Sequence, residues 1–157
     1  MHTISEHTHF LKDYVEGTLH KMHDNNLEHI SCLIMAQTIE LLGAYLDNKP
    51  MRSKGQSAKR FALAIDKLFP VEYSRLNHNN HLYFQLRTNY VHMLLPTNKL
   101  RIVLDDSKTL HLNKQDGVLC IVPSELLIHV SDAISKIATM LETGKIKPKK
   151  IETSQIS

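Results

Sequence analysis

The sequence predicts a mainly α fold: a helical bundle of about five helices with a small antiparallel β meander inserted before the last helix. Three successive patterns in the spacing of apolar residues support this prediction. From residue 5 to residue 95, apolar residues recur at intervals of three and four, the period of an amphipathic helix. After Pro96 the period falls to two, as in half-buried strands, and from Pro123 to Gly144 it returns to three and four.

Two long helices are expected before Pro50, over residues 5–23 and 27–46. The first has one apolar stripe, made of Leu11, Tyr14, Val15, Thr18 and Met22. The second is apolar over so much of its circumference that we expect it at the centre of the core. Asn26 is the expected N-cap of the second helix. This helix is expected to end before Pro50, because proline disfavours the helical conformation in the preceding residue.

A shorter helix is expected over residues 57–69, with Ser57 as its N-cap. Pro70 interrupts the pattern, and residues 71–76 are predicted to form one more helical turn. The stretch from Leu82 to Pro96 then predicts an amphipathic helix. Its polar strip consists of Gln85, Thr88, Asn89 and His92, edged by Arg87, and its packing face consists of Tyr83, Leu86, Tyr90, Met93 and Leu94.

Short strands are expected after Pro96, because apolar residues alternate over 100–104 and 110–112 and run without a break over 118–122. Turns at residues 105–107 and 115–117 separate them and indicate an antiparallel meander. The last helix is expected to begin at residues 123–125 with Ser124 as its cap and to end at Gly144.

The chain is predicted to form one domain over residues 1–144, with the β insert at about residues 99–122. The composition, 42% hydrophobic and 22% charged, is ordinary for a globular protein with a single core. Residues 145–157 contain too few large apolar groups to pack and are expected to form a flexible basic tail. The chain lacks a long uninterrupted apolar run and a signal-peptide pattern at its start, so no membrane association and a cytoplasmic location are expected.

The two cysteines, Cys32 and Cys120, are not spaced as metal ligands. Cys32 lies in a helical pattern and Cys120 in an apolar strand pattern. We interpret both as buried, reduced thiols. A disulfide between them is the alternative interpretation.

Positive charge is concentrated in the segment from residue 49 to residue 60, which has five cations and no acid. Arg52, Lys54, Lys59 and Arg60 are therefore candidate RNA-binding residues, which would attract phosphates without regard to base sequence. The alternative is a solvated linker without a partner.

The chain contains eleven histidines, several of which lie one helical turn from another histidine or an acid. The best metal candidate combines Glu16, His20 and His23 on the first helix, but it matches no recognised metal signature. Scattered surface histidines are the preferred interpretation, so no metal site and no cofactor are predicted.

Arg87 and His92 are the residues whose chemistry suggests a reaction. On an ideal helix they lie about 140° apart, yet a long arginine side chain can converge with an imidazole on one ligand. Arginine binds phosphate in a fork, and histidine exchanges protons near neutral pH. Such a pair suits RNA cleavage by attack of a ribose 2′-hydroxyl on the adjoining phosphodiester. A surface arginine and a surface histidine without a shared role remain the plainer interpretation of the spacing.

The pattern Leu82-Tyr83, Leu86-Arg87 and Val91-His92, followed by Pro96 and strands, resembles the HEPN superfamily. Proteins of this superfamily carry an arginine, followed a few residues later by a histidine, on a helical bundle. More narrowly, the pattern is similar to uncharacterised bacterial members in which the same stretch precedes strands. The resemblance covers about fifteen residues of motif and, loosely, the helical order of the domain.

The resemblance implies a metal-independent endoribonuclease of a toxin, defence or RNA-processing system. Arg87 and His92 would be the catalytic pair, assisted by Asn89 and Thr88, and a homodimer would bring two such motifs to one cleft. Its partners would be RNA and a protein such as an antitoxin. The chain departs from the family at Thr88, where asparagine, aspartate or histidine often follows the arginine. The alternative is a catalytically inactive HEPN-like binding or assembly module for RNA, a nucleotide or a protein partner.

Overall fold

The first helical segment is continuous from α1 (Ile4–Thr8) through η1 (His9–Glu16) to α2 (Gly17–Asp24) in the computed structural model, which describes residues 3–104 and 107–156. Thr3 begins it with a capping box, in which the Thr3 side chain accepts from the Glu6 N–H and the Glu6 carboxylate accepts from the Thr3 N–H. Asn26, at φ +58°, ends the segment in the left-handed conformation. The prediction that Asn26 caps the next helix is therefore wrong, because Leu27 occupies the cap position.

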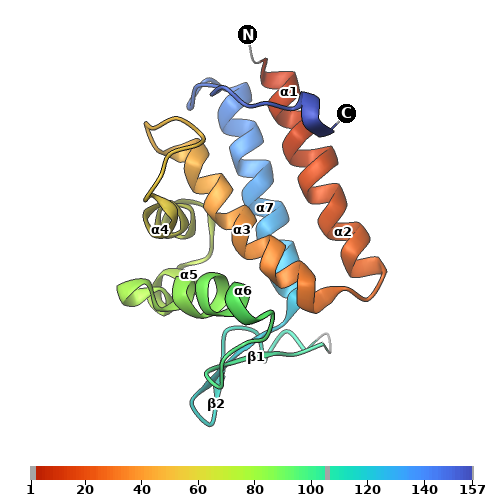
Figure 1. Cartoon of the computed structure of the whole chain (residues 1–157), viewed down its shortest axis with the longest axis vertical. Helices are drawn as coiled ribbons and strands as arrows, with labels where there is room; N and C mark the ends of the chain where they lie inside the picture. The colour runs from red at the N-terminus through yellow and green to blue at the C-terminus, as the bar shows by residue number, and fades with distance from the viewer. Residues whose placement is uncertain (1–2, 105–106, 157) are drawn as a thin grey trace.

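The second helix, α3 (Glu28–Leu46), is the centre of the fold, as predicted. It packs against α7 (Pro123–Glu142) and α4 (Ser57–Leu68), and the first helical segment contacts both α3 and α7 (Figure 1). At Gly43 an added Cβ would lie 1.9 Å from the backbone oxygen of Arg60, so only glycine permits the close crossing of α3 and α4. α3 is also long and apolar enough to cross a membrane, but 61% of that window is buried within this fold.

Helix α4 (Ser57–Leu68) is followed by α5 (Val71–Leu76), by the turn η2 (His78–Asn80), and by η3 (Tyr83–Asn89) running into α6 (Tyr90–Met93). The predicted interruption at Pro70 is confirmed, since Pro70 is the N-cap of α5. Ser57 begins α4 without capping it, because Gln56 stands at the N-cap and makes no side-chain cap bond. The Tyr83 ring meets the Phe61 ring edge-on at 5.4 Å, which joins η3 to α4.

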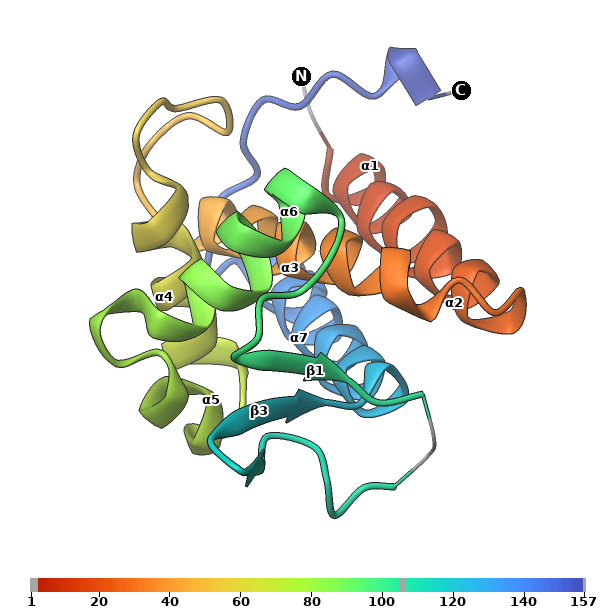
Figure 2. The same cartoon turned by 60° about the horizontal axis from the view of Figure 1, so that its bottom comes forward.

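The insert contains the strands β1 (Leu100–Ile102), β2 (Lys114–Gln115) and β3 (Val118–Ile121) in the order β1-β3-β2. The predicted antiparallel meander is corrected, because β1 pairs with β3 in parallel and only β2 pairs with β3 in antiparallel fashion (Figure 2). The alternation of apolar residues could not distinguish the two directions, since it reports only which side chains face the core. Asp116 and Gly117 both have positive φ, as a two-residue hairpin turn between β2 and β3 requires.

The expected strand at residues 110–112 is a run of turns. The N–H groups of Leu110, His111 and Asn113 each donate to a carbonyl three residues earlier, and Leu112 has φ +64°. These turns direct the His111 side chain inward, where it is 9% exposed. The expected turn at residues 105–107 includes 105 and 106, which lie outside the described residues.

Three polar side chains join this inserted segment to α5 and α7; we call Tyr73, His111 and His129 the inner cluster. The Val122 N–H donates to His111 Nδ1 at 3.0 Å, so the proton of His111 resides on Nε2. That Nε2–H donates to the Tyr73 hydroxyl at 2.8 Å, and the hydroxyl donates to His129 Nδ1 at 2.7 Å. Burial lowers the pKa of His111 to about 4, lowers that of His129, and raises that of Tyr73.

The last helix, α7 (Pro123–Glu142), begins with proline in its first turn and Val122 at the N-cap, so the predicted cap at Ser124 is wrong. Gly144, at φ +71°, ends the helical segment as predicted. With 64% of the chain helical and a three-stranded mixed sheet before the last helix, the mainly α prediction is confirmed. Both cysteines are buried and free, and burial raises the pKa of Cys32 to about 12.

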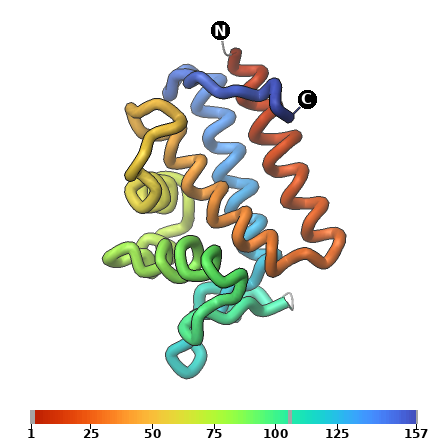
Figure 3. The backbone as a smooth tube through the Cα atoms, viewed as in Figure 1, coloured from red at the N-terminus to blue at the C-terminus, as the bar shows by residue number. Residues whose placement is uncertain are grey.

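The segment after Gly144 differs from the free tail that the sequence predicts. Figure 3 shows it turning back across the end of the bundle at which the chain begins. Ile146 packs on the core, Ile151 is 9% exposed, and the Lys149 ammonium donates to the backbone oxygens of Ala44, Asp47 and Lys49. These contacts attach the segment to the C-terminal end of α3.

Candidate functional site

Arg87 and His92 lie on one short helical segment whose first part is π-helical, from Tyr83 to Asn89. In a π-helix each N–H bonds to the carbonyl five residues earlier, so each residue turns the chain by less than in an α-helix. Arg87 and His92 are consequently separated by less than the 140° of an ideal α-helix. A second π-helical stretch, η1, lies in the first helical segment, so such a stretch does not by itself mark a site.

Arg87 is oriented toward α3, where its Nε lies 3.3 Å from Oε2 of Glu40. The two side chains are 23% and 15% exposed, respectively. The other carboxylate oxygen of Glu40 accepts a hydrogen bond of 2.8 Å from the Ser57 hydroxyl at the start of α4. One acidic residue therefore joins η3, α3 and α4 at the candidate arginine.

The contact between Arg87 and Glu40 is an ion pair without a hydrogen bond. The Nε of Arg87 and the Oε2 of Glu40 are enclosed, and neither has a hydrogen-bond partner among the described residues. The Nη atoms of Arg87 make no hydrogen bond in the described part of the chain and are not among its buried unpartnered atoms. The Nη atoms are therefore not fully enclosed, and their donors are not used by the described residues.

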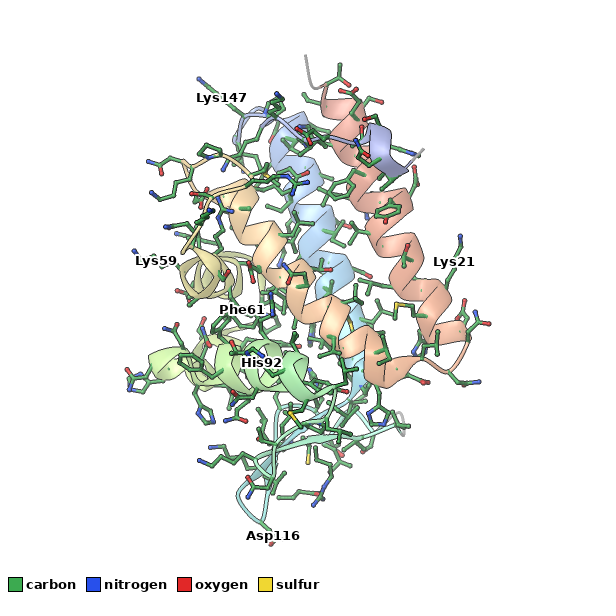
Figure 4. All side chains as sticks on the ribbon, in the orientation of Figure 1. Lys21, Lys59, Phe61, His92, Asp116 and Lys147 are labelled. Carbon is green, nitrogen blue, oxygen red and sulfur yellow. The ribbon has the colours of Figure 1, made fainter. Side chains whose placement is uncertain are left out.

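His92 is exposed near the end of α6 (Figure 4). Among the described residues, no hydrogen bond, ion pair or ring contact joins the His92 side chain to Arg87. The predicted packing face of this helix is confirmed at Leu86 and Tyr90, which are buried, but Met93 is 72% exposed. The chain leaves the helix through Leu94, whose φ is +54°.

The other residues of the polar strip differ in their surroundings. Thr88 and Asn89 are half-buried, and their side chains make no hydrogen bond within the described ranges. Gln85 is buried and accepts a hydrogen bond of 2.6 Å from the Thr97 hydroxyl. Gln85 therefore fixes the chain after the helix, while Thr88 and Asn89 remain near the candidate pair.

The candidate RNA-binding residues fall into two groups. Arg52, Lys54 and Lys59 are exposed, and Figure 4 shows Lys59 at the outer edge of α4. Arg60 is 5% exposed and makes four hydrogen bonds: two to the Asp47 carboxylate, at 2.7 and 3.4 Å, and one each to the carbonyls of Pro50 and Met51, both at 2.7 Å. The prediction that Arg60 binds RNA is corrected, since its guanidinium is already bonded inside the protein.

The Asp47 carboxylate also accepts a hydrogen bond of 2.8 Å from the Lys149 ammonium, so Asp47 joins α4 to the C-terminal segment. We call Arg60, Asp47 and Lys149 the Asp47 node. Burial alone would raise the pKa of Asp47, but hydrogen bonds from Arg60 and Lys149 outweigh it and lower the pKa to about 2. The node is thus a bonded charge cluster, and its cations are unavailable to an external phosphate.

The metal candidate on the first helix does not assemble. Glu16 pairs with Lys12 at 3.1 Å and lies 3.8 Å from His20 Nε2, while His23 makes no contact with this pair that would complete a ligand set. Among the described residues, no group of three or more histidine, cysteine, aspartate or glutamate side chains could hold a metal ion.

Enclosed space occurs elsewhere in the molecule. A groove of about 430 Å³ lies between the first helical segment and α3, and its lining is largely apolar, including Tyr14, Met22 and Ile34. A smaller pocket of about 310 Å³ lies beside Asp47 and Lys149. Neither the groove nor the pocket is lined by Arg87 or His92.

Sequence reasoning missed Glu40 and Ser57. A signal was present at Glu40, which is an isolated acid in a helix otherwise apolar from Ile30 to Leu46 apart from small or uncharged polar residues. Carboxylates in such surroundings are rarely buried unless they are paired. Comparisons with protein-family models, with curated proteins and with solved structures find no match to this chain.

Proposed function

We propose that this protein is an RNA-directed, HEPN-like protein in which Arg87 and His92 act on the RNA backbone. One observation carries the proposal. The Nε of Arg87 lies 3.3 Å from the Glu40 carboxylate while its Nη donors make no hydrogen bond with the described residues, and an exposed histidine lies on the same short helical segment. A fork of uncommitted donors is the arrangement that binds a phosphate oxygen pair.

The reaction that suits this pair is metal-independent cleavage of RNA. The ribose 2′-oxygen would bond to phosphorus while the bond from phosphorus to the 5′-oxygen breaks, leaving a 2′,3′-cyclic phosphate and a 5′-hydroxyl. His92 would accept the 2′-hydroxyl proton or donate a proton to the leaving 5′-oxygen. Arg87 would stabilise the charge that develops on the phosphate oxygens. We further propose a homodimer, in which the second His92 supplies the other proton transfer, and a cytoplasmic location.

The cleavage experiment uses the full chain, an oligoribonucleotide and excess chelator. We expect cyclic-phosphate products from the native protein and none from His92→Ala, whose exposed side chain should not affect folding. His78→Ala is the matched control, because His78 is also exposed and lies on the preceding turn. Full cleavage by folded His92→Ala would refute the catalytic assignment.

A second function, that of an inactive binding module, is favoured by a different observation. No hydrogen bond or ion pair joins His92 to Arg87 among the described residues, and the neighbouring side chains of Val91, Met93, Leu94 and Leu95 are exposed apolar groups. Such groups suit a protein partner better than a catalytic cleft. If such a module also binds RNA, through the separate basic segment, the binding should depend on salt, proceed without turnover, and be weakened by Lys54→Gln together with Lys59→Gln. Unchanged affinity at low salt would exclude the basic segment from binding.

A further inference from the structure

We propose that Glu40 is a positioning residue that orients Arg87 toward a phosphate group, with Ser57 anchoring the carboxylate. This inference rests on the proposed RNA-directed function and adds two residues from other helices to it. The carboxylate is engaged on both oxygens: Oε1 accepts from the Ser57 hydroxyl at 2.8 Å, and Oε2 lies 3.3 Å from Arg87 Nε.

Glu40 approaches Arg87 from the side of the guanidinium Nε. Arginine–carboxylate pairs are frequently bonded through two nitrogens in a fork. Here the closest approach is to Nε, and no guanidinium nitrogen of Arg87 makes a hydrogen bond in the described part of the chain. The ion pair therefore leaves the donors of the terminal guanidinium nitrogens unused by the described residues, and in this proposal it favours the orientation that presents them to a phosphate.

The Glu40 carboxylate is also anchored by a hydrogen bond from Ser57. Ser57 is the first residue of α4 and directly follows the basic segment that contains Arg52 and Lys54. Its hydroxyl holds one carboxylate oxygen, so the other oxygen keeps a defined place relative to η3. Arg87 is thereby positioned with respect to the same segment that would attract the RNA backbone.

Charge and position predict opposite effects for one substitution, which makes the inference testable. Glu40→Gln removes a negative charge near the proposed phosphate site, so a purely electrostatic role predicts tighter RNA binding. The amide nearly preserves the shape of the carboxylate but loses the ionic attraction to Arg87. A positioning role therefore predicts weaker binding, because Arg87 no longer holds its orientation.

The test measures binding of a 2′-O-methyl oligoribonucleotide, which lacks the attacking hydroxyl, over a series of salt concentrations. We expect Glu40→Gln to weaken binding about 5- to 10-fold, and Ser57→Ala to weaken it less. Loss of one phosphate contact should also reduce the magnitude of the salt slope by about 1, as in Arg87→Gln. In the Arg87→Gln background, Glu40→Gln should have no further effect.

The controls separate the possible outcomes. Glu142→Gln removes an exposed acid at the end of α7 and should leave the affinity and the slope unchanged. Tighter or unaltered binding by Glu40→Gln, with the native slope, overturns the positioning role while the proposed function stands. A native protein that does not bind RNA, or that binds as well after Arg87→Gln, overturns the proposed function itself. If Glu40→Gln does not fold, Ser57→Ala provides the same test by releasing only the anchor.

Discussion

Arg60 and Arg87 are two arginines that pair with carboxylates at α3, yet the protein uses them differently. Arg60 makes four hydrogen bonds around Asp47 and is 5% exposed. Arg87 makes none with the described residues and contacts Glu40 only as an ion pair at 3.3 Å. An arginine whose donors are bonded internally stabilises the fold, whereas one with open donors retains the capacity to bind an anion.

The comparison teaches how to separate structural from functional cations in this chain. Both arginines were candidates from the sequence, Arg60 for RNA binding and Arg87 for catalysis. The two arginines differ in the number of guanidinium donors that are hydrogen-bonded within the protein, whereas their charge is the same. The same criterion applies to Lys149, which is bonded, and to Lys54, which is exposed.

The largest expected effect comes from breaking the Asp47 node at its most buried member. Arg60→Met should lower the free energy of unfolding by about 3–5 kcal/mol, because the Asp47 carboxylate and two carbonyls lose their donors. Urea denaturation followed by circular dichroism measures this. Lys59→Met, at the exposed neighbouring position, should change stability by less than about 0.5 kcal/mol. Equal effects at the two positions would contradict the structural assignment of Arg60.

The next largest effect on stability is expected from the inner cluster, whose hydrogen bonds join uncharged groups and not ions. Between pH 6.5 and about 4 the unfolded chain binds a proton at His111 that the folded protein excludes, so stability should fall as the pH falls through this range. The loss is expected to be at most about 3 kcal/mol and should level off near pH 4.

The measurement for His111 is the difference in unfolding free energy between the native protein and His111→Gln at several pH values, which cancels the titration of unrelated acids. The difference should narrow as the pH is lowered from 7 to 4. A difference that stays constant over this range would show that His111 does not carry the pH dependence.

A smaller effect is expected from the cation that the C-terminal segment contributes. Lys149→Met should lower the unfolding free energy by about 1.5–3 kcal/mol, because Asp47 loses a charged hydrogen bond but keeps Arg60. Thermal unfolding of this variant can be compared with that of Lys150→Met, an exposed neighbour. Identical melting of both variants would mean that the segment behaves as the free tail first predicted.

The smallest effect on stability should come from Arg87. Arg87→Gln is expected to cost about 1 kcal/mol or less, because the half-buried ion pair makes no hydrogen bond. Urea denaturation of Arg87→Gln and Arg60→Met under the same conditions compares the two losses of unfolding free energy. A loss as large as that of Arg60→Met would make Arg87 a structural residue and remove the distinction between the two arginines.

Much of the fold could be predicted because it depends on local patterns. The three- and four-residue spacing located α3 and α7, Pro70 marked the start of α5, and Asp116-Gly117 marked the hairpin turn. The caps at Asn26 and Ser124 were wrong by one position or more, because the N-cap residues, Leu27 and Val122, make no side-chain cap bond, so a capping residue type did not mark either helix start. The site residues Arg87 and His92 could be proposed from residue type and spacing alone.

The sequence by itself determined the helical period, the turns and the candidate residue types, because each depends on neighbours within a few positions. Only the tertiary structure decided that β1 runs parallel to β3, that Lys149 packs beside α3, and that Arg60 is bonded to Asp47. It alone also brought Glu40 and Ser57 to Arg87. The physical reason is that these outcomes depend on which distant groups meet in the folded chain, and a charged side chain has the same local pattern whether or not its donors are already bonded.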